Sequence, residues 1–155
     1  MTCPARACVV FLVLAACSSA TNPSAGLPGP QGTVLTTVVH GTPWRVGDTT
    51  KVDLVITDTS SSTAVFELLE PVPTLEILDA SGDSIPVTYL GPPNFLSLSV
   101  GSGATVVTSA ILGVGGTPGG TTITANLTPG TYTVAACLVG APGECGQPVS
   151  VTVSQ

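Results

Sequence analysis

The sequence predicts an all-β fold on three observations. Residues that favour strands cluster in short runs bounded by Gly, Pro, Asp or Ser, and no stretch shows the sustained three-and-four spacing of apolar residues that marks a helix. The 18 Gly and 14 Pro residues together make 32 of 155, which is too many for a helical bundle. Because 43% of the residues are hydrophobic, the chain is also too apolar to be a disordered tail.

Eight or nine short strands are expected along the chain. The clearest is 51–57, in which apolar residues at positions 52, 54 and 56 alternate with Lys51, Asp53 and Thr57. Successive side chains of a strand point to opposite faces, so the first set is expected in the core and the second in solvent. The other candidate strands are 33–39, 63–69, 74–78, 85–90, 104–112, 121–125, 131–138 and 148–153.

This pattern indicates an immunoglobulin-like antiparallel β-sandwich of about seven to nine strands over residues 32–155. Since aromatic residues make up only 4% of the chain, the core is expected to consist mostly of Val, Leu and Ile. A Cys…Trp…Cys arrangement is absent from the sequence, which excludes an antibody-like member. The segment Asp79–Ser84 is expected to form a hairpin turn, because its two acids are too few ligands for calcium.

The first 16 residues have the order of a secretory signal peptide. A short segment with one cation, Arg6, precedes the apolar run Val9–Leu14, and small residues follow. This run is shorter than the roughly 20 apolar residues of a transmembrane helix. Residues 14–17, L-A-A-C, resemble the bacterial lipobox, whose cysteine receives diacylglycerol and becomes the first residue of the mature protein. The resemblance implies that Cys17 is lipidated. The alternative is an ordinary cleaved signal that ends in a cysteine by chance.

A flexible tether is expected to join the lipidated cysteine to the folded domain. Residues 17–31 are rich in Ser, Gly and Pro and show no periodicity. Acyl chains on Cys17 would hold the domain at a bilayer without any help from surface cations. The expected location is therefore the membrane of a bacterial cell envelope, at the outer membrane or the cell surface.

Cys137 and Cys145 are expected to form a disulfide bond. Cys3 and Cys8 lie in the segment that cleavage removes, and Cys17 is assigned to lipidation, so this pair remains for the folded domain. Two cysteines in an oxidising compartment pair most simply with each other, and the bond would close the end of a hairpin. A metal site is the alternative, but two thiols and one distant histidine fall short of a zinc pattern.

The charge balance and the catalytic residue types argue against nucleic acid binding and against an enzyme. Nine acidic residues oppose three basic ones, so phosphate groups would find almost no cations. His40 is the single histidine, and no G-x-S-x-G motif frames a serine, so His40 is expected to pack near Trp44 at a strand end. Carboxylates such as Glu67 and Glu76 are expected on a solvated face. Neither a cofactor nor a metal ion is predicted.

One segment near the C-terminus carries a family resemblance. Leu127–Val134 reads L-T-P-G-T-Y-T-V, a Pro-Gly turn that leads into a strand with a tyrosine. Together with segment 57–68 and the hairpin Asp79–Asp83, it resembles bacterial immunoglobulin-like modules of the intracellular proteinase inhibitor (BsuPI) type. The resemblance implies a β-sandwich with protease inhibition as an alternative function, although no inhibitory loop motif is carried over. The same turn occurs in carbohydrate-binding modules, which makes glycan binding a second alternative.

A candidate binding patch is formed by Phe95, Leu96 and Leu98, which follow two prolines in a loop-like setting. Exposed apolar patches mark binding sites, whereas the alternative is that these residues fold back as a strand end over the core. The sequence therefore predicts a membrane-anchored envelope lipoprotein that acts as a non-catalytic protein-interaction or structural module. Its expected partners are the membrane, through Cys17, and another envelope protein. The sequence makes no prediction of its oligomeric state.

Overall fold

The computed structural model describes residues 26–69, 73–90, 95–116, 123–138 and 144–155. The predicted signal peptide (1–16), the predicted lipidation site Cys17 and the first part of the predicted tether lie outside these residues. Within the described ranges, no helix has the length and apolar character needed to cross a membrane.

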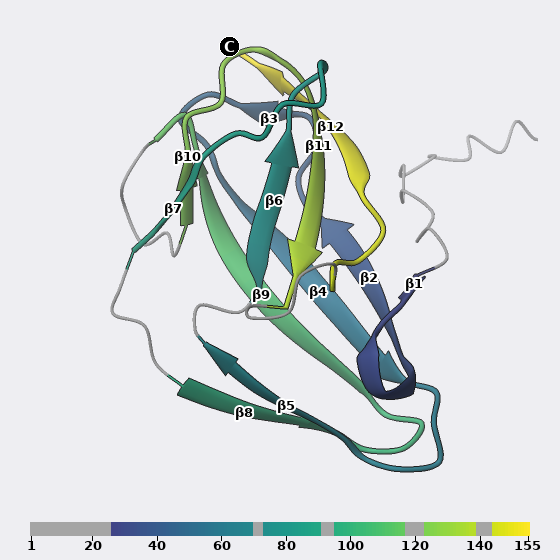
Figure 1. The fold of residues 1–155 in the computed structure, drawn as a ribbon. Coiled ribbons are helices and arrows are strands. Elements are labelled where there is room, and N and C mark those ends of the chain that lie inside the picture. Colours follow the sequence, from purple (N-terminus) through teal and green to yellow (C-terminus); the bar gives the residue numbers. More distant parts are fainter. Residues whose placement is uncertain (1–25, 70–72, 91–94, 117–122, 139–143) are drawn as a thin grey trace, which may run out of the picture.

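The domain is built from three sheets (Figure 1). A six-stranded sheet has the order β1-β2-β4-β9-β10-β7, made of β1 (Leu27–Pro28), β2 (Thr33–Val39), β4 (Thr49–Asp58), β9 (Thr105–Val114), β10 (Ile123–Ala125) and β7 (Val87–Tyr89). A four-stranded sheet has the order β3-β12-β11-β6, made of β3 (Trp44–Arg45), β12 (Val149–Ser154), β11 (Gly130–Cys137) and β6 (Thr74–Leu78). A two-stranded sheet pairs β5 (Ala64–Leu69) with β8 (Phe95–Val100).

The two-stranded sheet lies at the end of the domain opposite the C-terminus (Figure 1). Its strands continue the long β4–β9 pair, since Thr57 pairs with Thr105 in that ribbon and Ala64 pairs with Val100 in the next. Asp58 holds the corner between them: its carboxylate accepts the backbone N–H groups of Ser60 at 2.7 Å and Ala64 at 3.2 Å. Because the carboxylate binds these two amides, the ribbon can bend at this point while Asp58 itself stays buried.

The predicted all-β sandwich is confirmed, with more strands than expected. Twelve strands are described, together with one 3₁₀ turn, η1 (Pro30–Gly32), and no α-helix occurs in the described ranges. The three additional strands are β1, β3 and β8. β1 and β3 have two residues each, too few to show an alternation, and two prolines shortly before β8 favoured a loop. The sandwich is also not wholly antiparallel, because β10 runs parallel to β9 and β3 runs parallel to β12.

The core consists mostly of Val, Leu and Ile, as predicted, together with the aromatic residues Trp44, Phe66 and Tyr132. On β4, the predicted inward residues Val52, Leu54 and Ile56 are completely buried. Residues from all three sheets belong to one hydrophobic cluster, including Phe66 and Leu68 from β5. The largest fully buried side chains are Trp44, Leu35, Leu54, Ile56, Ile77, Leu112, Ile123, Leu127, Val52, Val100, Val114 and Val134.

The last residues of the predicted tether belong to the fold instead. β1 pairs with β2 through Leu27 opposite Leu35 and Pro28 opposite Val34. The Gln31 amide then makes two hydrogen bonds to one residue of β5: its Nε2 donates to the Val65 carbonyl at 2.7 Å, and its Oε1 accepts the Val65 N–H at 3.0 Å. The tether prediction was therefore wrong for residues 27–31, because Gly- and Pro-rich composition does not show that a short segment finds backbone partners.

The Leu127–Val134 motif forms a tyrosine corner, an arrangement found in immunoglobulin-type sandwiches. The Tyr132 hydroxyl donates to the Thr128 carbonyl at 2.9 Å and accepts the Thr128 N–H at 3.2 Å. Tyr132 is buried, whereas Thr128 is exposed, so the two bonds tie an exposed turn to a ring in the core. The motif therefore fixes the turn that leads into β11.

Replacing Tyr132 with phenylalanine is expected to lower the free energy of unfolding by about 1 kcal/mol, because the amide and carbonyl of Thr128 lose their bonds to the tyrosine hydroxyl. Urea denaturation followed by circular dichroism would measure the change. Thr131→Val provides the control, since Thr131 is exposed at the neighbouring position and should change stability by less than about 0.5 kcal/mol. Equal stability of the phenylalanine variant and the wild type would contradict the role given to the hydroxyl.

The predicted turn at Asp79–Ser84 is confirmed. The Asp79 carboxylate accepts the N–H groups of Ser81 at 2.8 Å and Asp83 at 3.0 Å. The Gly82 N–H donates to the Asp79 carbonyl at 3.0 Å, and Gly82 has a φ of 87°, which favours glycine. The Asp79 side chain is thus used to shape the turn.

Candidate functional site

Strand β8 carries the predicted binding patch, and strand alternation divides that patch between two faces. The Phe95 side chain is 88% exposed on the outer face of the two-stranded sheet. Leu96 and Leu98 are half-buried on the opposite face, where Leu98 packs against the core. All six residues pair with β5, so the segment is a strand and not a loop, and Leu98 follows the alternative in which the segment folds back over the core. Phe95 alone of the three is a strongly exposed apolar side chain.

One edge of β8 has no strand partner among the described residues. In the described part of the chain its one strand neighbour is β5. Edge strands of monomeric proteins are usually protected by lysine, proline, a bulge or a covering segment. β8 has the sequence F-L-S-L-S-V, without a charge, a proline or a glycine. The outer edge of β5 differs, because the Gln31 side chain binds the backbone of Val65 there.

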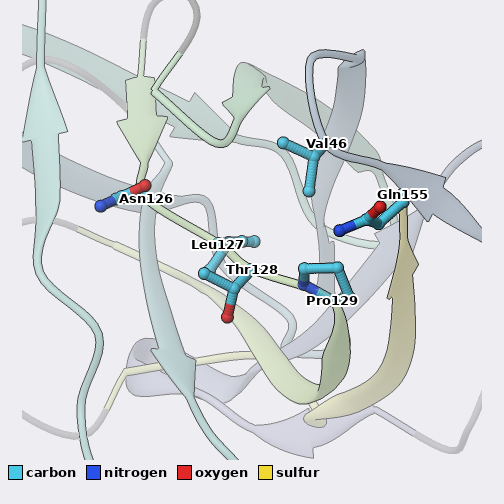
Figure 2. A pocket seen from close by; sticks show the side chains of 6 residues that line it. All are labelled: Val46, Asn126, Leu127, Thr128, Pro129 and Gln155. Carbon is cyan, nitrogen blue, oxygen red and sulfur yellow. The ribbon is translucent and has the colours of Figure 1, made fainter.

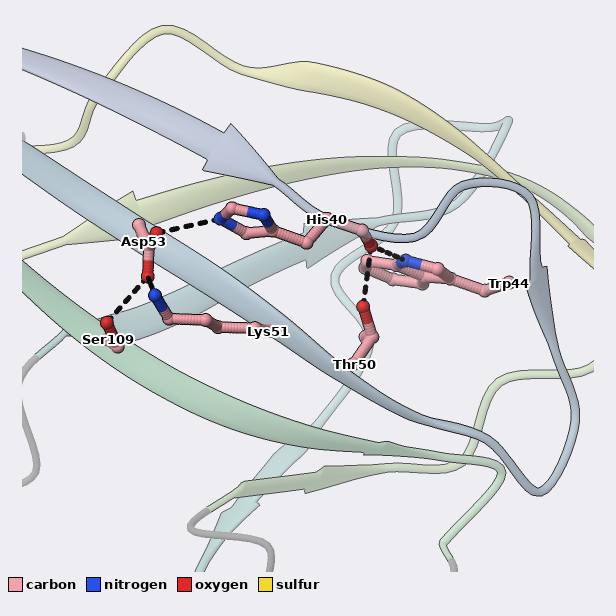
Figure 3. Close-up of polar contacts among 6 residues, drawn as sticks. All are labelled: His40, Trp44, Thr50, Lys51, Asp53 and Ser109. Atoms are coloured by element: carbon pink, nitrogen blue, oxygen red, sulfur yellow. Dashed lines mark hydrogen bonds and ion pairs between the residues drawn. The ribbon is translucent and has the colours of Figure 1, made fainter. Parts of the chain in front are cut away.

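A second polar arrangement, which sequence reasoning missed, surrounds Asp53 on the outer face of the six-stranded sheet (Figure 3). The Asp53 carboxylate contacts His40 Nε2 at 2.7 Å, Lys51 Nζ at 3.1 Å and the Ser109 hydroxyl at 2.6 Å. Asp53 was expected in solvent, but the three side chains cover it and leave it 6% exposed. Only the register of β4 and β9, which sets Ser109 directly opposite Asp53, could have indicated this contact.

The geometry of this cluster favours a structural role. A catalytic serine must donate its proton to the histidine, with the carboxylate on the far side of the ring. Here Ser109 donates to Asp53 instead, so the carboxylate stands between serine and histidine. The backbone carbonyl of His40 also accepts the Trp44 indole N–H at 3.0 Å and the Thr50 hydroxyl at 2.7 Å (Figure 3). The predicted position of His40 near Trp44 at a strand end is confirmed.

Hydrogen bonding lowers the pKa values of two aspartates. Burial opposes the ionisation of Asp53, but the bonds from Ser109, His40 and Lys51 outweigh it and hold the pKa of its carboxyl below the ordinary value. At Asp58, the hydrogen bonds from Ser60 lower the pKa of the carboxyl in the same direction. Both groups therefore favour the folded state in their charged form.

Acidification is expected to remove this stabilisation. Each of these carboxyl groups has a lower pKa in the folded chain than in the unfolded chain, where the value is 3.8. Its contribution to the free energy of unfolding is therefore complete above pH 3.8 and is lost as the pH falls from 3.8 through the folded pKa. Asp53→Asn should cost about 1 to 3 kcal/mol at pH 7, and this cost should shrink as the pH falls below 3.8. Urea midpoints across this range would measure the convergence. A constant difference between variant and wild type at all pH values would contradict it.

One pocket of about 370 Å³ lies at the end of the domain that holds the C-terminal residue (Figure 2). Its lining is neutral and contains no aromatic side chain. His40, the Asp53 cluster and the acids Glu67 and Glu76 do not line it. Such a lining offers hydrogen bonds but no general acid, general base or stacking surface. The lining residues are Val46, Asn126, Leu127, Thr128, Pro129 and Gln155.

The predicted disulfide between Cys137 and Cys145 is confirmed, with an S–S distance of 2.01 Å. The two residues also form an isolated antiparallel bridge, so the bond closes the end of a hairpin as expected. The Glu76 side chain offers an oxygen within 4.8 Å of the two sulfur atoms. Because the sulfurs are bonded to each other, they are not thiolate ligands for a metal in this state. Burial raises the pKa of the neighbouring Glu144 carboxyl.

Comparisons with known proteins found neither a matching family nor a matching curated protein. Among solved structures, the C-terminal domain of Wzt is 13% identical, with a TM-score of 0.47 over 84% of this chain and 77% of that one. A β-glucosidase from Erythrobacter marinus is 16% identical at a TM-score of 0.47, and the DNA glycosylase AlkC from Pseudomonas fluorescens is 16% identical at 0.44. The match to the β-glucosidase covers 76% of this chain but only 15% of that enzyme. The match to AlkC covers 77% of this chain but only 30% of that enzyme. Similarity at this level transfers no activity.

Proposed function

We propose that this protein is a lipid-anchored protein of a bacterial envelope whose sandwich domain is a non-catalytic protein-interaction module. Strand β8 is its contact surface, and lipidated Cys17 is its anchor. The observation that carries the proposal is the 88% exposure of Phe95 on a strand that has one partner strand among the described residues. Aromatic side chains that become buried at an interface contribute a large share of the binding energy.

Two further observations support this assignment. The ordered Gln31 joins the start of the domain to β5, so the segment that leads from the anchor ends next to the two-stranded sheet. The polar clusters of the described residues are used internally: Asp53 is surrounded by three partners, Asp58 shapes a corner and Asp79 shapes a turn. Among the exposed large apolar side chains of the described residues, Phe95 is by far the most exposed, at 88% against 52% or less for the others.

The anchor is tested by fractionation of cells that express the full-length chain. Wild-type protein should sediment with membranes and incorporate an alkyne-labelled fatty acid. Cys17→Ala should lose the label and leave the membrane fraction, while Cys137→Ser/Cys145→Ser should retain both. Membrane association of Cys17→Ala equal to that of the wild type would overturn the anchor.

The contact surface is tested by a photoreactive benzoylphenylalanine at position 95 of the full-length chain. Irradiation of intact cells should give a discrete covalent adduct. The matched control places the same residue at Val107, which is 52% exposed on the outer face of β9, and should give much less adduct. Absence of any adduct from position 95 would overturn β8 as a contact surface.

A further inference from the structure

The strand that forms the proposed contact surface is suited to pairing with itself. β8 has no charged residue, whereas the chain as a whole has a formal net charge of −6. Two copies of an acidic chain repel each other over most of their surfaces, so they meet most easily where neither carries charge. The nearest acid in this sheet is Glu67, which lies on β5 opposite Ser97. Pairing through β8 therefore brings together the uncharged edges of two sheets.

We propose that β8 pairs antiparallel with β8 of a second copy of this chain, about a twofold axis at Ser97. This inference rests on the proposed function, because it names the partner of the same surface. Pairing would join the two sheets into one of four strands in the order β5-β8-β8-β5. The Glu67 side chains of the two copies would then lie three strand spacings apart, roughly 14 Å. This separation exceeds the Debye length of about 8 Å at physiological ionic strength, so their repulsion is screened.

The register follows from which faces match. Residues directly opposite each other lie on the same face of a sheet. An axis at Ser97 sets Phe95 opposite Ser99 of the second copy on the outer face, and Leu96 opposite Leu98 of the second copy on the inner face. An axis at Leu98 would instead require pairing at Val100, which is fully buried at the corner of the domain. The Ser97 register uses the accessible part of β8 and places the Phe95 ring beside Ser99 of the second copy.

A six-residue strand forms a small interface, and the membrane anchor supplies the missing affinity. Two domains anchored to one membrane meet at a high effective concentration, so a weak contact becomes populated without additional interactions. The dimer is thus expected at the envelope more than in dilute solution. For this reason the test uses the full-length chain in cells.

The first test combines photocrosslinking at position 95 with two differently tagged copies of the chain. The expected adduct has twice the mass of the chain and carries both tags. Ser97→Glu, which brings two anions together at the axis with Glu67 beside each of them, should reduce this adduct roughly tenfold. Val65→Glu is the matched control, because it adds the same charge to the same face of β5, where Val65 is 44% exposed, and should leave the adduct intact.

The second test measures the register with single cysteines under mild oxidation. Ser97→Cys should give a disulfide-linked dimer, because the two introduced cysteines face each other at the axis. Ser99→Cys should give several-fold less dimer, because each introduced cysteine faces Phe95 of the other copy. Equal yields from both variants would overturn the register. A position 95 adduct that contains only a different protein would overturn self-pairing while the proposed function stands. Absence of any adduct would overturn both.

Discussion

Replacing Trp44 with alanine is expected to lower the free energy of unfolding by about 3 to 5 kcal/mol. Trp44 is 1% exposed and is the single tryptophan of the chain. It also closes the His40 loop, since its indole N–H donates to the His40 carbonyl at 3.0 Å. Trp44 lies on β3, which pairs with β12 through Val153 in the four-stranded sheet. The indole belongs to the hydrophobic cluster shared by the sheets, so its removal would leave a cavity in that common core.

Urea denaturation followed by far-ultraviolet circular dichroism would measure this loss without relying on tryptophan fluorescence. Trp44→Phe is the control that separates volume from hydrogen bonding, because it retains most of the apolar volume and removes the N–H donor. It should cost about 1 to 2 kcal/mol. A Trp44→Ala variant within 1 kcal/mol of the wild type would show that the side chain is less important to the core than its burial indicates.

The sandwich was predictable because alternation leaves a strong signal wherever one face of a strand is buried. On β4, Val52, Leu54 and Ile56 are buried as expected. The strands that escaped prediction are short, like β3, or adjoin prolines, like β8. In such segments tertiary pairing decides the structure, and the local pattern carries too little information.

The candidate site was only partly predictable, for the same physical reason. The sequence indicated Phe95 as a candidate binding residue. That Phe95 lies on the opposite face from Leu96 and Leu98 follows from the alternation of side chains in a strand, which a loop would not impose. The Asp53 cluster joins His40, Lys51 and Ser109, and only the sheet register brings Ser109, more than 50 positions away, to the aspartate. The local sequence shows that Asp53 faces outward but not that neighbouring side chains cover it.

The buried partner of the contact strand provides the second large effect. Phe66 on β5 is 6% exposed and lies opposite Leu98 of β8, on the face that packs against the core. Phe66→Ala is expected to cost about 3 to 5 kcal/mol if the two-stranded sheet unfolds together with the sandwich. If the sheet can open separately, amide exchange in β5 and β8 should instead accelerate while the strands of the four-stranded sheet remain protected.

Phe95→Ala is the matched comparison, because it removes the same side chain from the outer face of the same sheet. At 88% exposure this ring contributes little to folding, and the variant should stay within about 0.5 kcal/mol of the wild type. Denaturation and hydrogen exchange of the two variants would therefore separate a phenylalanine that stabilises the fold from one that the fold does not need. Comparable losses in both variants would mean that Phe95 packs against the domain, and its exposure would then no longer support a contact surface.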